Sequence, residues 1–399
     1  MASTTAPADR PAPAAAGAPP PPATRLFFVD NIRLFLTALV ILHHLMITYA
    51  GSGGWYYEEG REDLITGALG TWFCTSNQAY FMGLFLLISA YFTPGSYDRK
   101  GAWRFMKDRL IRLGIPLVIY SWIIHPLLIY LLRYGGEGLR PMMWADMLAP
   151  FTEGPLLGSG PLWFVTLLLI LSALYVLWRK LRPAAPATPP APSKGFPSNR
   201  ALILFGLGLW AATFAMRLQF KADQYTFVPL NFQLAYFAQY LIMFVVGLAA
   251  YRRNWLLNMP DQVGKRWLWV AAALFLILMP LAAVCGAFES VEPFQGGWYW
   301  QGAVYMLWEA FFCLSACISV VYLFRRYANV QTRLTRWLAP NAYTAYILHA
   351  PVLVLLAGGL RGVELYPFLK FVIMAPIALA TCWGLSALIR KLPYTDRVL

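Results

Sequence analysis

The chain has 399 residues, of which 59% are hydrophobic and 13% charged, and its mean hydropathy is +0.54. This composition excludes an ordinary soluble domain and indicates a protein that crosses the membrane several times. The formal net charge of +14 could suggest nucleic acid. However, the basic residues form no clustered domain, so we expect no nucleic-acid partner.

The first 24 residues are rich in Ala and Pro and cannot bury enough apolar surface to fold, so we predict a disordered cytoplasmic tail. The apolar run that follows, 26–50, is long and contains Arg33. A cleaved signal peptide has a shorter apolar region and a small-residue cleavage site. We therefore expect this run to remain as the first membrane helix.

Apolar runs of about twenty residues predict about ten transmembrane helices, and thus an all-α polytopic bundle. The runs lie near 26–50, 69–93, 113–133, 161–178, 200–217, 231–251, 267–288, 299–324, 341–359 and 366–389. We expect one membrane domain over 25–392, with a Pro-rich cytoplasmic linker at 182–199 and a short cytoplasmic tail at 393–399.

Basic residues alternate between successive connecting segments. With the N-terminus inside, the inner segments hold 24 of the 32 Lys and Arg, and the outer segments hold seven. An excess of basic residues in alternate loops is typical of the cytoplasmic side. We therefore predict that both termini are cytoplasmic, as in a bacterial inner-membrane protein.

Arg33 and His44 stand eleven residues apart in the first apolar run. A helix advances about 100° and 1.5 Å per residue, so the two lie on nearly the same face, roughly 16 Å apart. Ionisable groups inside a membrane helix usually face a functional interior. A neutral His44 suits a general base and Arg33 suits an anion, whereas His43 lies about 80° away and fits an interhelical hydrogen bond. The structural alternative for Arg33 is an ion pair with Asp30 or Glu309.

The densest basic segment, 99–112, precedes the third run. Contacts with lipid headgroups explain four of its basic residues, Arg99, Lys100, Arg104 and Lys107. Arg109 and Arg112 lie deeper, three residues apart on one helical face, where two guanidinium forks could bind phosphates.

Four further polar or aromatic positions are candidates: Glu309, His125, Tyr346 and His349. A carboxylate such as Glu309 is costly in the bilayer and needs a partner or a cavity. His125 fits either an acceptor site or the membrane interface. Tyr346 and His349 share a face, and interhelical hydrogen bonding explains them at least as well as catalysis.

Other features favour structural interpretations. The aromatic clusters at 55–57 and 298–300 are more typical of interfacial belts than of a sugar-stacking groove. The five cysteines are odd in number and scattered, so we predict neither a disulfide framework nor a metal site. No nucleotide-binding loop, zinc-protease motif or nucleophile elbow is present, so any chemistry must come from the membrane helices.

Together these motifs resemble the acyltransferase-3 family of integral membrane acyltransferases, including its glucan-modifying members. The first run resembles the family's R-x10-H helix, and 109–116, RLIRLGIP, resembles its R-x-x-R segment followed by Pro. Weaker similarities lie at 85–92, 160–164 and 346–351, with Ala90 where the family often has Gly.

The resemblance implies an O-acyltransferase that moves an acetyl or similar short acyl group from cytoplasmic acyl-CoA, with acetyl-CoA expected, to a hydroxyl of an extracytoplasmic carbohydrate. It implies His44 as the catalytic histidine, with Arg33, Arg109 and Arg112 engaging the donor, and no permanently bound cofactor. The alternative is a proton-coupled transporter or glycan flippase with Arg33, His44 and Glu309 as a proton relay. The lack of an internal repeat favours the enzyme.

Overall fold

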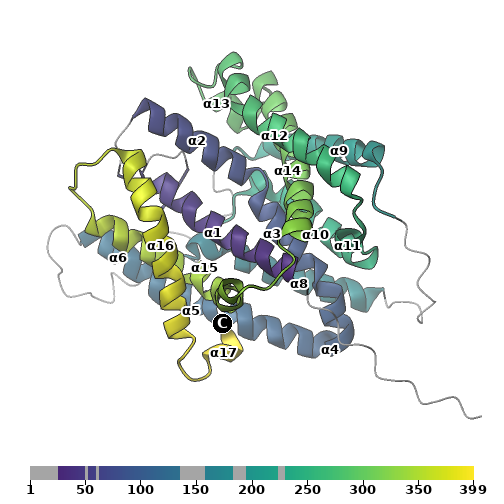
Figure 1. Ribbon diagram of the computed structural model, residues 1–399, viewed down its shortest axis with the longest axis horizontal. Helices are drawn as coiled ribbons and strands as arrows, with labels where there is room; N and C mark the ends of the chain where they lie inside the picture. The colour runs from purple at the N-terminus through teal and green to yellow at the C-terminus, as the bar shows by residue number, and fades with distance from the viewer. Residues whose placement is uncertain (1–25, 50–52, 60–62, 135–157, 183–194, 223–229) are drawn as a thin grey trace, which may run out of the picture.

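A computed structural model describes residues 26–49, 53–59, 63–134, 158–182, 195–222 and 230–399. The predicted tail at 1–24 and most of the linker at 182–199 lie outside these ranges. The described residues form helices joined by short connections, without β-strands. This confirms the predicted all-α bundle (Figure 1).

Nine helical segments of the described chain are long and apolar enough to cross a membrane. They are α1 (Phe27–Tyr49), the run Thr93–Arg133, Gly160–Leu181 with α8 (Trp163–Leu181), α9 (Asn199–Gln219), Leu234–Arg252 with α10 (Phe237–Arg252), α12 (Asp261–Val284), α14 (Trp300–Tyr327), α15 (Arg333–Gly359) and α16 (Pro367–Ile389). Short helices α11 (Trp255–Asn258), α13 (Glu292–Gln295) and α17 (Thr395–Val398) lie in the connections and at the end of the chain.

The second predicted run forms two helices, α2 (Leu64–Gln78) and α3 (Phe81–Tyr91), in place of one span. The helix breaks at Ala79 and Tyr80, and Gln239 of α10 donates a hydrogen bond to the Ala79 carbonyl at the break. Inside a membrane a freed backbone group must find such a partner within the protein. Neither helix is among the nine membrane-length segments, so the described chain has one such segment fewer than the ten predicted.

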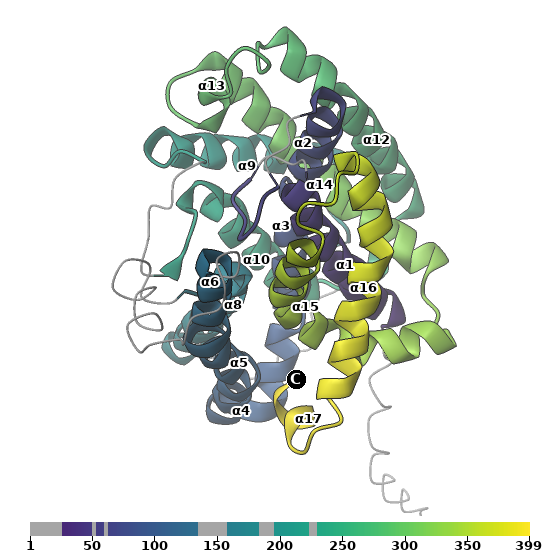
Figure 2. The same ribbon diagram turned by 90° about the vertical axis from the view of Figure 1, so that its left-hand side faces the viewer.

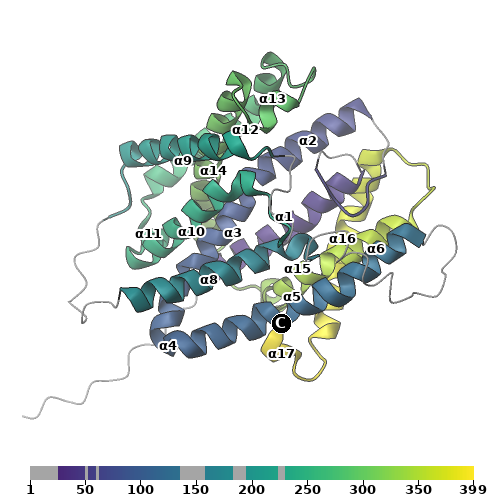
Figure 3. The ribbon, with the colours of Figure 1, turned by 180° about the vertical axis from the view of Figure 1, so that it is seen from behind.

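The third run is longer than predicted, because helical structure begins at Thr93 in place of residue 113. It comprises α4 (Thr93–Arg109), α5 (Ile115–Ile119) and α6 (His125–Tyr134), joined by the π-helical turns η1 (Leu110–Gly114) and η2 (Tyr120–Ile124). Figure 3 shows α4, α5 and α6 following one another along one edge of the bundle, next to α8. Gly101, with φ at 71°, makes a sharp bend within α4.

Helices α1 and α15 run side by side in the same direction. Phe28 N donates to Asn329 Oδ1 at 3.2 Å near their beginnings, and His44 meets His349 further along. The end of α16 returns to the same level, where Trp383 Nε1 donates to the Leu338 carbonyl at 3.2 Å. Both ends of the described chain therefore lie on one side of the bundle, which we call the terminal side. In Figure 2 α17 lies at the bottom, on the terminal side, and α13 lies at the top.

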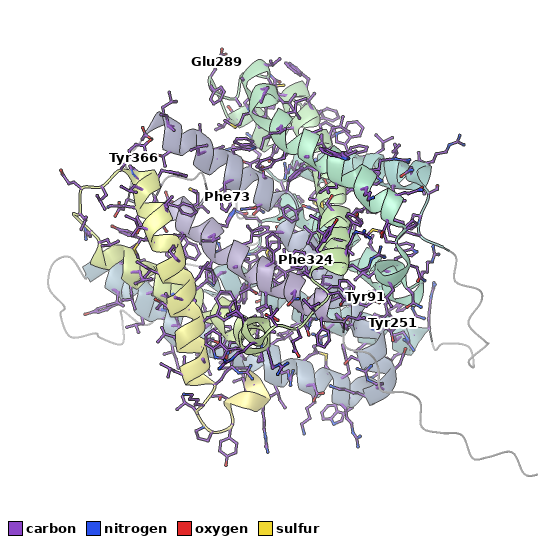
Figure 4. All side chains as sticks on the ribbon, viewed as in Figure 1. Phe73, Tyr91, Tyr251, Glu289, Phe324 and Tyr366 are labelled. Carbon is purple, nitrogen blue, oxygen red and sulfur yellow. The ribbon has the colours of Figure 1, made fainter. Side chains whose placement is uncertain are left out.

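Close helix contacts depend on small residues and aromatic pairs. The Cβ position of Gly247 on α10 faces the Leu87 backbone of α3, so the two helices approach more closely there than a larger residue would allow. Tyr91 of α3 and Tyr251 of α10, labelled in Figure 4, pack edge to face with ring centroids 5.6 Å apart.

On the side opposite the termini, a polar contact joins the segments that precede two helices. Tyr366, labelled in Figure 4, donates to Asp63 Oδ2 at 2.6 Å and so joins the beginnings of α16 and α2. Hydrogen bonds from Thr66 and Tyr366 lower the pKa of Asp63, because they stabilise its charged form.

Candidate active site

Two histidines from different helices meet at the centre of the site. Nδ1 of His44 on α1 lies 3.0 Å from Nε2 of His349 on α15, and the two rings stack with centroids 5.0 Å apart. His349 is 0% exposed. The structure thus brings together two candidates that the sequence places 305 residues apart.

The hydrogen-bond chain defines which nitrogens carry protons. Nδ1 of His349 hydrogen-bonds to the backbone carbonyl of Tyr346, which can only accept, so that nitrogen carries the proton. In the neutral ring Nε2 of His349 is then an acceptor, and Nδ1 of His44 must donate to it. This assignment leaves Nε2 of His44 with a free lone pair, which is the atom that a general base requires.

Trp55 covers the His44 ring. The two rings stack with centroids 3.9 Å apart and an interplanar angle of 13°. Trp55 Nε1 is buried without a hydrogen-bond partner among the described residues. The prediction that residues 55–57 form an interfacial belt is therefore wrong for Trp55, because this side chain packs on His44. In contrast, Trp298 is 83% exposed.

Tyr56 and His125 form a second polar contact beside this cover. Tyr56 Oη lies 2.7 Å from His125 Nδ1 and 3.3 Å from Tyr120 Oη, so Tyr56 also belongs to the site and not to a belt. Gly160 has a φ of 44°, and a Cβ there would collide with the Tyr56 hydroxyl. Glycine at this position therefore permits both the left-handed turn and the close approach of Tyr56.

A cavity of about 1170 Å³ adjoins these groups. Its lining includes His43, His44, Trp55, Tyr56, His125, Trp163, Arg217, Tyr236, Tyr240, Tyr305 and Tyr346. Further lining comes from residues 279–295, 222 and 231, all on the side of the bundle opposite the termini. The cavity therefore extends from His44 towards that side.

His43 and Tyr346 have supporting positions in the cavity wall. His43 is 6% exposed, its ring centroid lies 5.0 Å from that of Phe81, and its Nδ1 has no hydrogen-bond partner among the described residues. Tyr346 donates its hydroxyl proton to the Pro161 carbonyl and so joins α15 to the beginning of the Gly160–Leu181 segment.

The three predicted arginines gather on the terminal side. The charges of Arg33 and Arg112 both act on Arg109, and the Tyr343 hydroxyl donates to the Arg112 carbonyl at 2.8 Å. Arg33 Nη1 lies 3.8 Å from Asp30 Oδ1, and its Cζ lies 4.8 Å from the Phe92 ring centroid. Guanidinium groups that repel one another form a site suited to a polyanionic ligand.

The described cavity lining contains His44 but none of these arginines. His44 contacts His349 of α15, whereas Arg33 contacts the Phe92 ring and its charge acts on Arg109. The arginine cluster therefore lies outside the described cavity lining, nearer the beginning of α1 than the histidine pair.

Glu309 pairs with a residue that sequence analysis missed. Arg217 Nη2 lies 2.9 Å from each carboxylate oxygen of Glu309, and the side chains are 1% and 3% exposed. The possible Arg33–Glu309 ion pair is therefore wrong, because Glu309 pairs with Arg217 and Arg33 lies beside Asp30. Arg217 lies at the predicted end of its span, where a charge resembles an ordinary loop residue, so only its position inside the last turn of α9 could have distinguished it.

A bundle of membrane-length helices with a buried histidine pair beside a cavity defines a polytopic membrane protein with a candidate active site. A family model described as an acyltransferase domain, Acyl_transf_3, matches residues 26–387. The chain therefore belongs to the acyltransferase-3 family and is an integral membrane acyltransferase. No curated protein and no solved structure matches the chain significantly.

Proposed function

We propose that the protein transfers an acetyl or other short acyl group from cytoplasmic acyl-CoA to a hydroxyl of an extracytoplasmic carbohydrate. The terminal side would face the cytoplasm of a bacterial cell, in accordance with the excess of basic residues in that side's segments. The observation that carries the proposal is the His44–His349 pair, which leaves a basic nitrogen at the inner end of the cavity.

The donor would bind through its phosphates to Arg33, Arg109 and Arg112. Arginine forks match phosphate geometry, and three neighbouring cations are stabilised by an anion that bridges them. The roughly 16 Å from Arg33 to His44 along α1 is comparable to an extended pantetheine arm.

In the proposed reaction, Nε2 of His44 removes the proton of the acceptor hydroxyl as its oxygen attacks the thioester carbonyl. The C–S bond then breaks, and the coenzyme thiolate takes the proton from Nε2 of His44. The positive charge that develops on His44 during transfer is shared with His349 through their hydrogen bond. No other co-reactant is needed.

The first experiment follows thioester consumption by the purified full chain in lipid nanodiscs with radiolabelled acetyl-CoA, and with longer acyl-CoA donors in parallel. We expect activity that falls at least 100-fold in His44→Ala with an unchanged melting temperature, because removal of a general base costs about 10²–10⁴. An inert wild-type protein across all donors, or a His44→Ala variant as active as the wild type, contradicts the proposal.

A second measurement separates direct transfer from an acyl-histidine intermediate. Acid quenching within one turnover, followed by peptide mass analysis, would detect an acyl group on the peptide that contains His44. The proposal of His44 as a base predicts that no acylated peptide accumulates. An acyl adduct on His44 that forms and decays at the rate of turnover would assign it as a nucleophile.

A further inference from the structure

Arg217 is a buried cation in the wall of the cavity, separate from the three arginines assigned to the donor. It lies in the last turn of α9, is 1% exposed, and lines the same cavity as His44. The loop that contains Gly297 holds its backbone, because Gly297 N donates to the Arg217 carbonyl at 2.9 Å.

The guanidinium of Arg217 is only partly satisfied by the protein. Nη2 pairs with Glu309, whereas Nε and Nη1 have no hydrogen-bond partner among the described residues. The Tyr305 side chain also forms a hydrogen bond with the guanidinium, so the two unpaired nitrogens are the only part of it that the described protein leaves unsatisfied. Unpaired buried N–H groups are rare and costly in folded proteins, so such donors in a cavity wall indicate a ligand or water that accepts from them.

Glu309 determines the charge of that ligand. Its carboxylate already neutralises Arg217 within the buried pair. An anionic ligand would therefore lose its hydration without gaining a net positive charge to pair with. Arg133, the other charged residue of the described lining, is exposed, and solvent weakens its interaction. The site therefore favours a neutral oxygen acceptor, such as a hydroxyl or ether oxygen.

A row of aromatic rings leads to Arg217. Trp163 and Tyr240 stack with centroids 5.3 Å apart, Tyr240 and Tyr236 stack at 6.2 Å, and Arg217 Cζ lies 4.8 Å from the Tyr236 ring centroid. All four side chains line the cavity. Because Tyr240 stacks between Trp163 and Tyr236, and Tyr236 lies against the guanidinium, the rings hold Arg217 in place in the cavity wall. Polar groups beside such an apolar wall bind the hydroxyls of a ligand.

We infer that Arg217, with Tyr236, Tyr240 and Trp163, forms an acceptor subsite that binds a neutral sugar unit of a longer glycan through its non-reacting hydroxyls. The cavity of about 1170 Å³ exceeds the about 300–1,000 Å³ usual for drug-sized ligands, so it accommodates more than one sugar unit. The subsite rests on the proposed acyl transfer only for the presence of a glycan acceptor. Its residues select and orient that acceptor and take no part in the chemistry.

The test uses the double variant Arg217→Met/Glu309→Leu of the full chain. Replacing both members of a buried ion pair with apolar residues of similar size is often neutral for stability, and here it removes the unpaired N–H groups. The matched control is Lys221→Met/Glu292→Leu, which removes an exposed pair, 3.2 Å apart, outside the described cavity lining. If the double variant melts early, Arg217→Lys replaces it, because lysine keeps the ion pair but loses the donor fork.

The probes are radiolabelled glucose trisaccharides with α-1,4, β-1,2 and β-1,3 linkages and a galacturonate trisaccharide, measured by equilibrium dialysis. We expect the wild type and the control to bind at least one neutral trisaccharide more tightly than the galacturonate. We expect the Arg217 variant to bind that trisaccharide at least tenfold more weakly. Where acyl transfer is active, the variant should raise the acceptor KM at least tenfold, with thioester hydrolysis in the absence of acceptor within twofold of wild type.

Neutral-trisaccharide binding that is unchanged in the variant, absent from the wild type, or weaker than galacturonate binding overturns the inference. The two proposals fail separately. A wild-type protein that consumes no thioester but binds a neutral trisaccharide through Arg217 supports the subsite and contradicts the proposed transfer. His44-dependent transfer with an unchanged acceptor KM in the Arg217 variant supports the transfer and contradicts the subsite.

Discussion

His349→Leu tests whether His349 holds the reactive form of His44. The substitution keeps an apolar side chain of moderate size but removes the acceptor 3.0 Å from His44 Nδ1. The hydrogen bond between His44 and the Val40 backbone remains. Without His349, however, the His44 ring is freer to carry its proton on Nε2 or to rotate, and in either case the lone pair no longer points at the acceptor hydroxyl.

The expected effect follows from the loss of one buried hydrogen bond. Leaving a buried polar group unsatisfied costs about 1–3 kcal/mol. Each 1.36 kcal/mol corresponds to tenfold in rate, so kcat should fall about 5- to 150-fold. The assay is single-turnover thioester consumption at saturating acetyl-CoA, with a melting curve for each variant.

The matched control is His349→Gln, because a glutamine carbonyl can accept near the position of Nε2 while its amide can donate to the Tyr346 carbonyl. We expect Gln to recover most of the activity that Leu loses. Wild-type kcat in His349→Leu would refute the tautomer argument. Equal losses in both variants with lowered melting temperatures would assign His349 to packing alone.

Three further outcomes are expected. Arg33→Lys should raise KM for acetyl-CoA about 10- to 150-fold, because it removes a charge-assisted hydrogen bond worth about 1.5–3 kcal/mol. Turnover of acetyl-pantetheine, which lacks the nucleotide phosphates, should stay unchanged, and equal effects on both donors would contradict phosphate binding. Trp55→Leu should increase thioester hydrolysis without acceptor at least threefold, because the His44 ring loses its cover. Hydrolysis that is unchanged in a chromogenic assay of the released thiol would refute that role. Glu309→Leu alone should lower the free energy of unfolding by about 3–5 kcal/mol, because it leaves the buried Arg217 charge unpaired. A free energy of unfolding equal to that of Arg217→Met/Glu309→Leu, measured by denaturation, would contradict the ion-pair argument.

Local periodicity was sufficient to predict most of the architecture. Nine of the ten predicted apolar runs correspond to membrane-length helical segments, because rise and rotation per residue vary little within a helix. The break between α2 and α3 could not be predicted in this way. Neither Ala79 nor Tyr80 is a Gly or Pro that would mark a break. The freed Ala79 carbonyl accepts a hydrogen bond from Gln239, which lies 160 residues further along the chain.

The partners within the site were harder to predict, because they are tertiary. Sequence left two interpretations of His349 open, and only the position of α15 beside α1 shows that His44 is its neighbour. In the sequence, Arg217 resembles an ordinary charged residue at the end of a span. Only the packing of α14 against α9 shows that it pairs with Glu309. Aromatic residues near a span end usually mark the interface, so Trp55 was misassigned for a reason that holds at Trp298.

The cover on His44 gives the site a physical basis for discriminating between water and a larger acceptor. Trp55 lies in a segment tied to α1 by the hydrogen bond from Glu59 N to the Thr48 carbonyl at 2.9 Å. The segment is tied to α16 by the ion pair between Lys370 Nζ and Glu59 Oε2 at 2.6 Å, with side chains 2% and 9% exposed. The tethered ring covers one face of His44, and in the proposed reaction it would limit the approach of water to the base. A glycan that gains contacts elsewhere in the cavity has binding energy available to displace the ring, whereas a single water molecule has none. In the proposed reaction, the acceptor contacts and the cover would therefore act together to favour transfer over hydrolysis.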